Sequence, residues 1–210
     1  MTSDVQWSIA WIRDVAEQIA LRKAELTTLD REIGDADHGE NLNRGFSAVV
    51  DRLATATLAP ETVGDVLKLV ATTLMSTVGG AAGPLYGTAF LRASKVCDTP
   101  VLSPEQAVGF VEAALEGIQV RGKATTGEKT MVDAWSPALD AARGVQLEGG
   151  SVAEVFSAAA AAALAGAEAT IPMKATKGRA SYLGERSVGH KDPGATSTGI
   201  ILESAARTVK

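Results

Sequence analysis

Three carboxylates near residue 30 have the type and spacing expected of a cation site. Asp30, Asp35 and Asp37 are followed directly by His38, with the amide of Asn41 shortly after. Hard cations such as Mg²⁺ take oxygen ligands, and proteins usually hold them with a few carboxylates, waters and substrate phosphates. The segment therefore predicts a metal site that acts on phosphates.

Other uses of these side chains are weaker matches. An EF-hand loop that starts at Asp35 would need a glycine at its sixth position and a glutamate at its twelfth, where this chain has Glu40 and Phe46. A solvated acidic connector and a carboxylate pair for glycoside hydrolysis remain as alternatives. The density of acids beside a histidine favours the cation.

The spacing of the acids also predicts the local structure. Residues five apart on an α-helix lie about 140° apart around its axis, so Asp30 and Asp35 cannot share a helix face. We expect the helix to end at Gly34 in the left-handed conformation. The next helix, over residues 40–53, would then present its N-terminus to an anion.

Three further polar or glycine-rich segments lie between predicted helices. Residues 76–87 are rich in glycine and alanine, which let backbone amides approach a phosphate or a flat ring, although a tight interhelical turn is an equal alternative. Residues 122–130 resemble a Walker A loop, but Glu128 separates Gly127 from Lys129 and the preceding segment is helical in pattern. We therefore reject a P-loop there and predict a looser turn that contacts a nucleotide.

The third segment, residues 172–195, is the longest predicted loop. It carries an excess of basic side chains, namely Lys174, Lys177, Arg179, Arg186, His190 and Lys191. Long loops inside a compact domain are usually functional or disordered. A basic loop in an acidic protein predicts a lid over phosphates, in which arginine can bind phosphate oxygens.

Hydrophobic periodicity places these segments between helices. We predict a first helix capped by Ser3 or Asp4 and further helices over residues 40–53, 63–75, 85–96, 104–120, 131–142, 151–170 and 195–208, with Pro60 suited to a helix start. No segment alternates in the manner of a strand. The pattern predicts an all-α, antiparallel barrel or bundle of about eight helices, with residues 1–210 as a single domain.

Composition narrows the class of protein. The net charge is −5, which gives no basic field for nucleic acid, and the single cysteine, Cys97, fits a reducing compartment. The N-terminus carries charges within its apolar pattern, so it predicts neither a signal peptide nor a membrane span. The alanine-rich segment 157–169 is too short to cross a bilayer. We therefore expect a cytoplasmic protein without a membrane or nucleic-acid partner.

Four segments in order along the chain resemble one known family. Residues 34–46, 76–90, 122–135 and 177–197 are similar to the ADP-binding subunits L of bacterial dihydroxyacetone kinases. The resemblance implies an eight-helix barrel whose rim loops hold ADP or ATP through two Mg²⁺ ions.

The resemblance also implies roles for individual residues. The metal ligands would be Asp30, Asp35 and Asp37, and Arg179 is a candidate to stabilise charge in the transition state. The nucleotide would be contacted by His38, Gly39, Asn41, Ala81, Ala82, Gly122, Thr130, Met131, Arg179, Asp192, Pro193 and Gly194. The family often has serine or threonine near position 82, so Ala82 removes only a hydroxyl contact.

The family divides its chemistry between chains. The resemblance implies a separate subunit K that holds dihydroxyacetone and a phosphohistidine carrier, subunit M, that rephosphorylates the bound ADP. We expect the general base for the sugar hydroxyl to lie on the partner. Two alternatives stay open: a subunit that uses free ATP on another keto-sugar such as erythrulose, and a non-catalytic nucleotide sensor that binds a transcriptional regulator.

Overall fold

The computed structural model describes residues 3–56 and 59–209, and every regular element within them is a helix. The α-helices are α1 Val5–Leu21, α2 Lys23–Ile33, α3 His38–Thr55, α4 Val63–Thr77, α5 Ala82–Val96, α6 Pro104–Gly122, α7 Val132–Leu147, α8 Val152–Ala169 and α9 Pro193–Thr208. A 3₁₀ segment, η1 Arg179–Ser187, precedes α9. The all-α prediction is confirmed.

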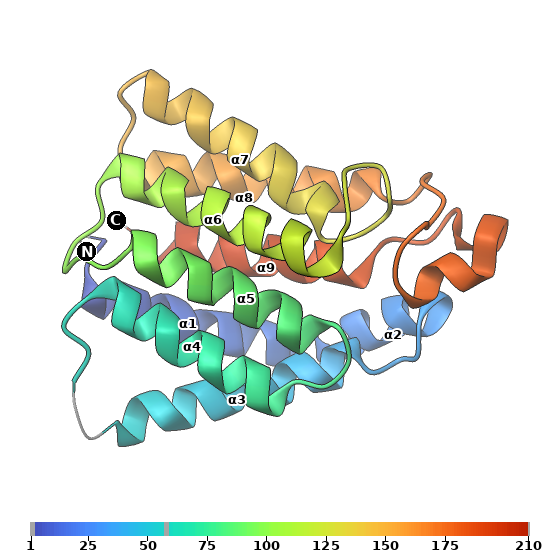
Figure 1. Ribbon diagram of the computed structural model, residues 1–210, viewed down its shortest axis with the longest axis horizontal. Helices are drawn as coiled ribbons and strands as arrows, with labels where there is room; N and C mark the ends of the chain where they lie inside the picture. The colour runs from blue at the N-terminus through green and yellow to red at the C-terminus, as the bar shows by residue number, and fades with distance from the viewer. Residues whose placement is uncertain (1–2, 57–58, 210) are drawn as a thin grey trace.

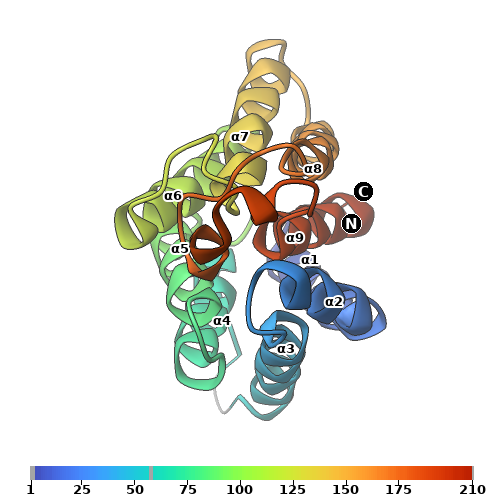
Figure 2. The same ribbon diagram turned by 90° about the vertical axis from the view of Figure 1, so that its right-hand side faces the viewer.

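Eight of the helices in the described residues form a closed ring. Each helix from α3 to α9 packs on the next one in sequence, and α1 closes the ring by packing on both α9 and α3. Figure 1 shows the helices running roughly along the long axis of the molecule, with both termini at one end and η1 at the other. Figure 2 looks onto the η1 end, where η1 lies in front of the ring.

The ninth α-helix of this part of the chain, α2, was not predicted as a separate element. It continues from α1 after a break at Arg22, whose φ and ψ of −100° and 11° are not helical, and it packs on α3 and α9 at the η1 end. No glycine or proline marks the break, so hydrophobic spacing alone did not reveal it. Helix α2 carries Asp30 in its last turn, next to the loop that follows.

Aromatic side chains fill the middle of the ring. Trp7 and Trp11 of α1 stack with ring centroids 5.3 Å apart, and Phe110 of α6 meets Trp11 edge-on at 5.2 Å. Phe156 of α8 lies 5.3 Å from Trp7. Aromatic pairs of this geometry add about 0.5–1.5 kcal/mol each beyond their buried area. The few aromatic residues of the chain thus hold opposite walls of the ring together.

Polar caps set where several helices begin. Asp4 accepts a hydrogen bond from the backbone amide of Trp7, and Thr62, Ser103 and Ser151 form capping boxes at α4, α6 and α8. The expected start at Pro60 is therefore wrong by three residues, because Thr62 supplies the cap. Helix α7 runs beyond the predicted end at residue 142 to Leu147, and Pro137 lies in its second turn.

Helix α8 has the length and mean hydropathy of a membrane span, with 39% of it buried inside the molecule. It packs between α7 and α9 in the ring. A core helix of a globular protein passes the same test, and the packing of α8 accounts for its composition.

Candidate functional site

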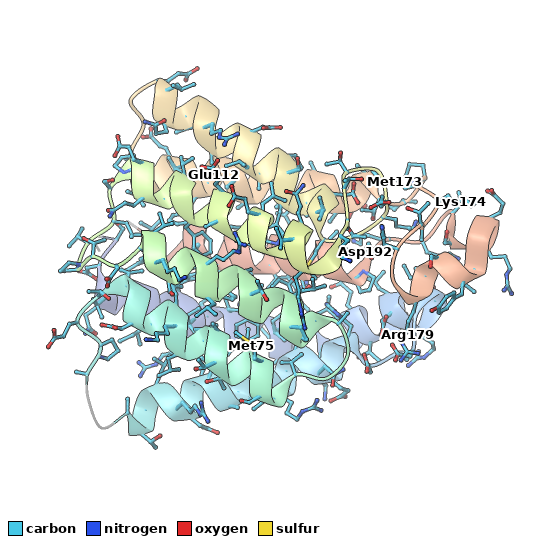
Figure 3. All side chains as sticks on the ribbon, viewed as in Figure 1. Met75, Glu112, Met173, Lys174, Arg179 and Asp192 are labelled. Carbon is cyan, nitrogen blue, oxygen red and sulfur yellow. The ribbon has the colours of Figure 1, made fainter. Side chains whose placement is uncertain are left out.

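A cavity of about 510 Å³ opens at the η1 end of the ring. Its walls come from the end of α2 and the loop after it, the start of α5, the segment from the end of α6 to the start of α7, the start of η1 and the start of α9. Ligand pockets usually have volumes of about 300–1,000 Å³. Figure 3 labels Arg179, Asp192, Met173 and Lys174 at this end of the molecule, with Glu112 on α6 away from it.

The three predicted metal ligands meet at one side of this cavity. One oxygen from each of Asp30, Asp35 and Asp37 lies within 4.8 Å of the others. Asp30 is buried in the last turn of α2, and its Oδ2 accepts hydrogen bonds from the backbone amides of Asp37 (2.8 Å) and His38 (3.1 Å). Asp30 thus fixes the loop and the start of α3 while contributing to the carboxylate cluster.

The backbone between these acids differs from the prediction. Gly34 ends α2 as expected, but with φ −141° rather than in the left-handed conformation. A Cβ at Gly34 would lie 2.1 Å from Asp30 Oδ1, so any larger residue would displace the Asp30 carboxylate. The left-handed residue is instead Ala36, with φ 63°, between Asp35 and Asp37. A non-glycine residue in this region is uncommon and costs about 1–2 kcal/mol, and such strain gathers at functional sites.

The cluster has the donors that a hard cation needs. Three carboxylates converge on one point, and the cation beside them in the described structure is Arg179, whose Nε lies 3.0 Å from Asp35 Oδ2. This single positive charge leaves the cluster negative. Oxygen-only ligands, negative charge and an open side toward the cavity fit Mg²⁺ with waters or phosphates completing its shell.

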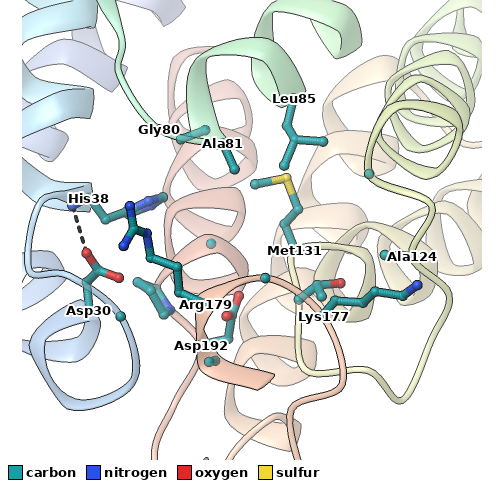
Figure 4. A pocket seen from close by; sticks show the side chains of 18 of the residues that line it. Asp30, His38, Gly80, Ala81, Leu85, Ala124, Met131, Lys177, Arg179 and Asp192 are labelled. Carbon is teal, nitrogen blue, oxygen red and sulfur yellow. Dashed lines mark hydrogen bonds between the residues drawn. The ribbon is translucent and has the colours of Figure 1, made fainter. Parts of the chain in front are cut away.

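His38 lies at the N-terminus of α3 beside this cluster. Figure 4 shows His38 and Asp30 on the same side of the pocket as Arg179. Burial lowers the pKa of His38 to about 4, although the charge of Asp30 opposes this shift. The imidazole is therefore neutral near pH 7, and its Nε2 lies 2.9 Å from Ser197 Oγ.

Two predicted residues of the segment 34–46, Gly39 and Asn41, do not line the cavity. Gly39 faces α2, where a Cβ would lie 2.3 Å from the carbonyl oxygen of Lys23. Asn41 is buried, and its Oδ1 accepts a hydrogen bond from Arg44. Neither residue lines the cavity. Their expected nucleotide contacts stay predictions, and in this structure both residues support the loop instead.

The segment 76–87 forms a glycine turn that packs against the loop and helix start around residues 34–41. Gly79 and Gly80 line the cavity, and Gly80 has φ 65°. A Cβ at Gly79 would come within 3.4 Å of Asn41 Oδ1, so Asn41 lies directly behind this turn. Ala81 and Ala82 follow at the start of α5 and also line the cavity.

The segment over residues 122–130, between α6 and α7, is held in shape by Asp133 and Lys129. The Asp133 carboxylate accepts hydrogen bonds from the backbone amides of Gly127 and Thr130. Lys129 is 1% exposed, and its Nζ donates to the carbonyl oxygens of Thr170 (2.8 Å), Ile171 (3.2 Å) and Met173 (3.0 Å). Lys129 thus joins this segment to the start of the basic loop. The resemblance to a Walker A loop is accidental, since this lysine points at helix-end carbonyls.

The basic loop contains the 3₁₀ segment η1 and contacts the α2 side of the cavity as well as Glu128, which Thr176 and Lys177 reach from the loop. Its 3₁₀ segment is broken at Gly184, which has φ 57°. Arg179 pairs with Asp35, and His190 Nδ1 lies 2.9 Å from Glu32 Oε2 on α2. Ala175 and Ala180 pack on Ile33 in a small apolar cluster separate from the main core. The loop predicted over residues 172–195 therefore contains a short helical segment.

The start of α9 lies at the base of the cavity. Asp192 caps this helix by accepting a hydrogen bond from the backbone amide of Ala195 (2.7 Å), and Pro193 and Gly194 form its first turn. Burial is the largest cause that raises the pKa of Asp192 to about 7, helped by Asp133 and Asp30 and opposed by the Ala195 hydrogen bond and Lys129.

The far side of the cavity is apolar and was not predicted. Leu85, Ile118 and Ala124 line it together with the predicted Met131. Figure 4 shows Leu85, Met131 and Ala124 on the side opposite Asp30 and His38. Leu85 and Ala124 belong to the segments 76–87 and 122–130, for which the sequence allowed or predicted ligand contacts, whereas Ile118 matches an ordinary core position of α6 and gave no signal. The cavity therefore has an acidic end and an apolar end.

The structure brings most of the predicted site residues to one place. The cavity is lined by Asp30, Asp35, Asp37, His38, Ala81, Ala82, Gly122, Thr130, Met131, Arg179, Asp192, Pro193 and Gly194, and not by Gly39 and Asn41. These residues come from segments far apart in the chain.

Comparisons with known proteins agree in sequence and in fold. A family model described as the DAK2 domain matches residues 32–207. The chain is 43% identical over 208 residues to the ADP-binding subunit DhaL of PEP-dependent dihydroxyacetone kinase 1 from Listeria innocua, covering 99% of this chain and 98% of that protein. It is also 43% identical to the corresponding DhaL subunit from Escherichia coli, covering 96% of each.

A solved structure shows the same arrangement of helices. The dihydroxyacetone kinase from C. freundii, in complex with AMP-PNP and Mg²⁺, matches with a TM-score of 0.71 and 25% identity over 99% of this chain. The chain spans about a third of that kinase, since the match covers 34% of the solved chain.

Proposed function

This chain belongs to the DAK2 domain family, among the ADP-binding subunits of PEP-dependent dihydroxyacetone kinases, and we propose that it holds a magnesium nucleotide and delivers its phosphoryl group to dihydroxyacetone. In this proposal residues 1–210 act as one nucleotide-binding domain. Dihydroxyacetone is held by a separate subunit K, and a phosphohistidine carrier, subunit M, regenerates ATP from the bound ADP. In this proposal the phosphoryl transfer takes place in the cytoplasm.

The observation that carries the proposal is the polarity of the cavity. Its acidic end holds Asp30, Asp35 and Asp37, and its apolar end holds Leu85 and Met131. A nucleoside diphosphate has the same division, since its phosphates need cations and its base is a flat and largely apolar ring. The C. freundii kinase, which was solved with AMP-PNP and Mg²⁺, supports this choice of ligand.

The residues of this chain would divide the binding between them. Asp30, Asp35 and Asp37 would hold two Mg²⁺ ions, and backbone groups at Ala81, Ala82, Gly122 and Gly194 allow close approach of a ligand. When bound, the magnesium nucleotide supplies the phosphoryl group and neutralises part of its charge. Arg179 would stabilise the charge that builds up during transfer, because its guanidinium already lies at the acidic end.

No proton acceptor for the sugar hydroxyl is placed in the cavity by these assignments. His38, with a pKa of about 4, is a weak base near pH 7, Asp30, Asp35 and Asp37 are assigned to the metals, and the buried Asp192 is engaged as the cap of α9. We therefore propose that the general base lies on subunit K. In each cycle a P–N bond of the carrier breaks as ADP becomes ATP, and the γ-phosphoryl bond then breaks as the sugar oxygen is phosphorylated.

The test separates the donors and the rival functions. Purified protein should retain ADP through gel filtration, and with subunit K present a phosphohistidine carrier should sustain turnover better than free ATP. Turnover with exchanging ATP and erythrulose would favour the alternative kinase. Nucleotide binding without transfer from any donor would favour a regulatory sensor.

A further inference from the structure

A buried group of hydroxyls lies behind the cavity where α3, α5 and α9 meet. Tyr86 of α5 and both Ser197 and Thr198 of α9 are fully excluded from solvent. The Tyr86 hydroxyl lies 2.7 Å from Ser197 Oγ, 3.1 Å from Thr198 Oγ1 and 3.1 Å from the carbonyl oxygen of Gly194. Ser197 Oγ also contacts His38 Nε2 at 2.9 Å. The group therefore connects three walls of the cavity.

We propose that Tyr86 and Ser197 are positioning residues that hold His38 in the tautomer protonated at Nε2 and at a fixed separation from the first turn of α9. The inference rests on the proposed nucleotide site, because His38 and Gly194 both line that cavity. It assigns a role to two residues that make no direct contact in the proposed binding scheme.

Packing alone does not account for the hydroxyl of Tyr86. Phe90 lies one turn further along α5, is equally buried and packs on Trp11 and Phe110 without a hydroxyl. Burying a polar group costs free energy unless it is hydrogen-bonded. Among the described residues the Tyr86 hydroxyl has hydrogen-bond partners only on α9, so its contribution is to fix α9 relative to α5.

Counting protons assigns the tautomer of His38. Thr198 Oγ1 donates to the Gly194 carbonyl oxygen at 2.9 Å, as serine and threonine often do inside helices, and Ser197 Oγ donates to the same oxygen at 3.1 Å. This oxygen also accepts the helix bond from the Thr198 backbone amide, so it has no capacity left for Tyr86, whose shortest contact is Ser197 Oγ at 2.7 Å. Tyr86 then donates to Ser197 Oγ. Because this arrangement uses the single Ser197 proton on the Gly194 oxygen, it places the proton of the His38 contact on Nε2.

This arrangement uses every donor of the group. Ser197 Oγ accepts from both Tyr86 and His38 and donates once, which is the full capacity of a hydroxyl. The other nitrogen of His38 is then an acceptor. A ligand can meet it only through a donor, such as a ribose hydroxyl, an exocyclic amine or a metal-bound water, and not through a phosphate oxygen.

Three conservative variants test the inference. Tyr86→Phe removes one hydroxyl, Ser197→Ala removes the shared acceptor, and Ser204→Ala is the control, because Ser204 is a buried serine further along α9 whose Oγ has no partner among the described residues. The chain has two histidines, so the variant His190→Gln leaves His38 as the sole ¹⁵N imidazole signal.

The expected results combine spectroscopy and binding. In free protein the imidazole ¹⁵N shifts should show Nε2–H for the wild type and Ser204→Ala, and a mixture of tautomers for Ser197→Ala. Tyr86→Phe and Ser197→Ala should each weaken Mg–ADP binding about five- to tenfold, as expected for loss of one hydrogen bond. The double variant should bind within about twofold of Ser197→Ala, since both act through one group.

Two results would overturn the inference: an Nδ1–H tautomer in the wild type, or binding by Tyr86→Phe that stays within about twofold of the wild type. If the wild type itself does not bind Mg–ADP, the proposed function fails instead. The tautomer of the free protein and its change in Ser197→Ala then decide the inference without a nucleotide.

Discussion

The guanidinium of Arg179 and the carboxylate of Asp35 form an ion pair at the acidic end of the cavity, with Nε 3.0 Å from Oδ2. Arg179 therefore occupies an oxygen that the proposed metal site needs. The arginine side chain is 68% exposed, and exposed ion pairs contribute only about 0–1 kcal/mol. A divalent cation can thus displace it, which frees the guanidinium to face the phosphates.

Replacing Arg179 should separate metal binding from phosphoryl transfer. In Arg179→Gln, Mg²⁺ affinity measured by calorimetry without nucleotide should stay equal or rise by up to about fivefold, because the competing cation is gone. The transfer rate should fall by at least about 10²-fold, since transition-state charge loses its donor. Arg186→Gln, in the same 3₁₀ segment, is the control. A transfer rate within a few-fold of the wild type would remove Arg179 from the chemistry.

Asp35→Asn should abolish tight nucleotide binding. The change keeps the shape of the side chain but removes a charge from a cluster whose oxygens lie within 4.8 Å of each other. Loss of groups that only support metal ligands costs about 10–100-fold, so loss of a direct ligand should exceed about 10²-fold. Calorimetry with Mg–ADP measures the effect, and circular dichroism checks the helices. Asp140→Asn, an exposed acid on α7, should bind normally. Retained ADP affinity with intact helices would exclude Asp35 as a metal ligand.

Ala36 should tolerate glycine and resist a β-branched residue. Its φ of 63° is accessible to glycine without strain, while valine in the left-handed region should lose about 1–2 kcal/mol of stability or more. Ala36→Gly should match or exceed the wild type in urea unfolding and keep its metal affinity. Ala36→Val should be less stable and should bind Mg²⁺ more weakly, because Asp35 and Asp37 lie on either side. Equal Mg²⁺ affinity in both variants would mean that this conformation does not align the acids.

The contrast between Gly34 and Ala36 shows how far the sequence predicts this site. Acid spacing placed a helix end at Gly34, and the four loop segments were correctly expected to lie near one rim. The identity of the left-handed residue could not be predicted, because alanine gives no signal for positive φ. Likewise Ile118 looks like a core position of α6 in the sequence, and only three-dimensional packing places it at the cavity.

Tyr86 illustrates the same limit for buried polar groups. In the sequence it matches a core position of α5, and its partners Gly194 and Ser197 lie more than a hundred residues away. Helical periodicity identifies which face of a helix is buried but not which helix covers it. Hydrophobic periodicity and the family resemblance were enough to predict a barrel of eight helices. The contacts of Tyr86 with α9 could not be predicted, because they form only when the ring has closed.

Asp192 and His38 should make opposite contributions to the pH dependence of stability. The pKa of Asp192 is raised to about 7 in the folded chain and that of His38 is lowered to about 4, against ordinary values of about 3.9 and 6.5. Stability from Asp192 is thus full below pH ~4 and lost as pH rises to about 7. Stability from His38 is full above pH ~6.5 and lost as pH falls to about 4.

Single variants should expose these opposing slopes between about pH 4.5 and 6.5. Relative to the wild type in EDTA, the free energy of urea unfolding of Asp192→Asn should rise more steeply with pH, because only the His38 contribution remains. His38→Gln should show the reverse slope. If the profile of Asp192→Asn runs parallel to the wild type, Asp192 does not hold a proton in the folded chain over this range.

Lys129 should be essential for joining the segment 122–130 to the basic loop. Its ammonium group neutralises the C-terminal end of α8 and satisfies carbonyl oxygens of Thr170, Ile171 and Met173 that have left the helix. Lys129→Met keeps the apolar stem but strands these carbonyls, so the free energy of unfolding should fall by about 2–4 kcal/mol. Lys123→Met is a matched control, since Lys123 lies in the same segment with φ 51° but is exposed. Limited proteolysis should cut Lys129→Met faster than Lys123→Met within residues 174–191, because the start of that loop is no longer held. Equal cutting and equal stability in the two variants would show that the other contacts of the basic loop are sufficient to hold it, namely those of Thr176 and Lys177 with Glu128 and those of Arg179 and His190 with the α2 side.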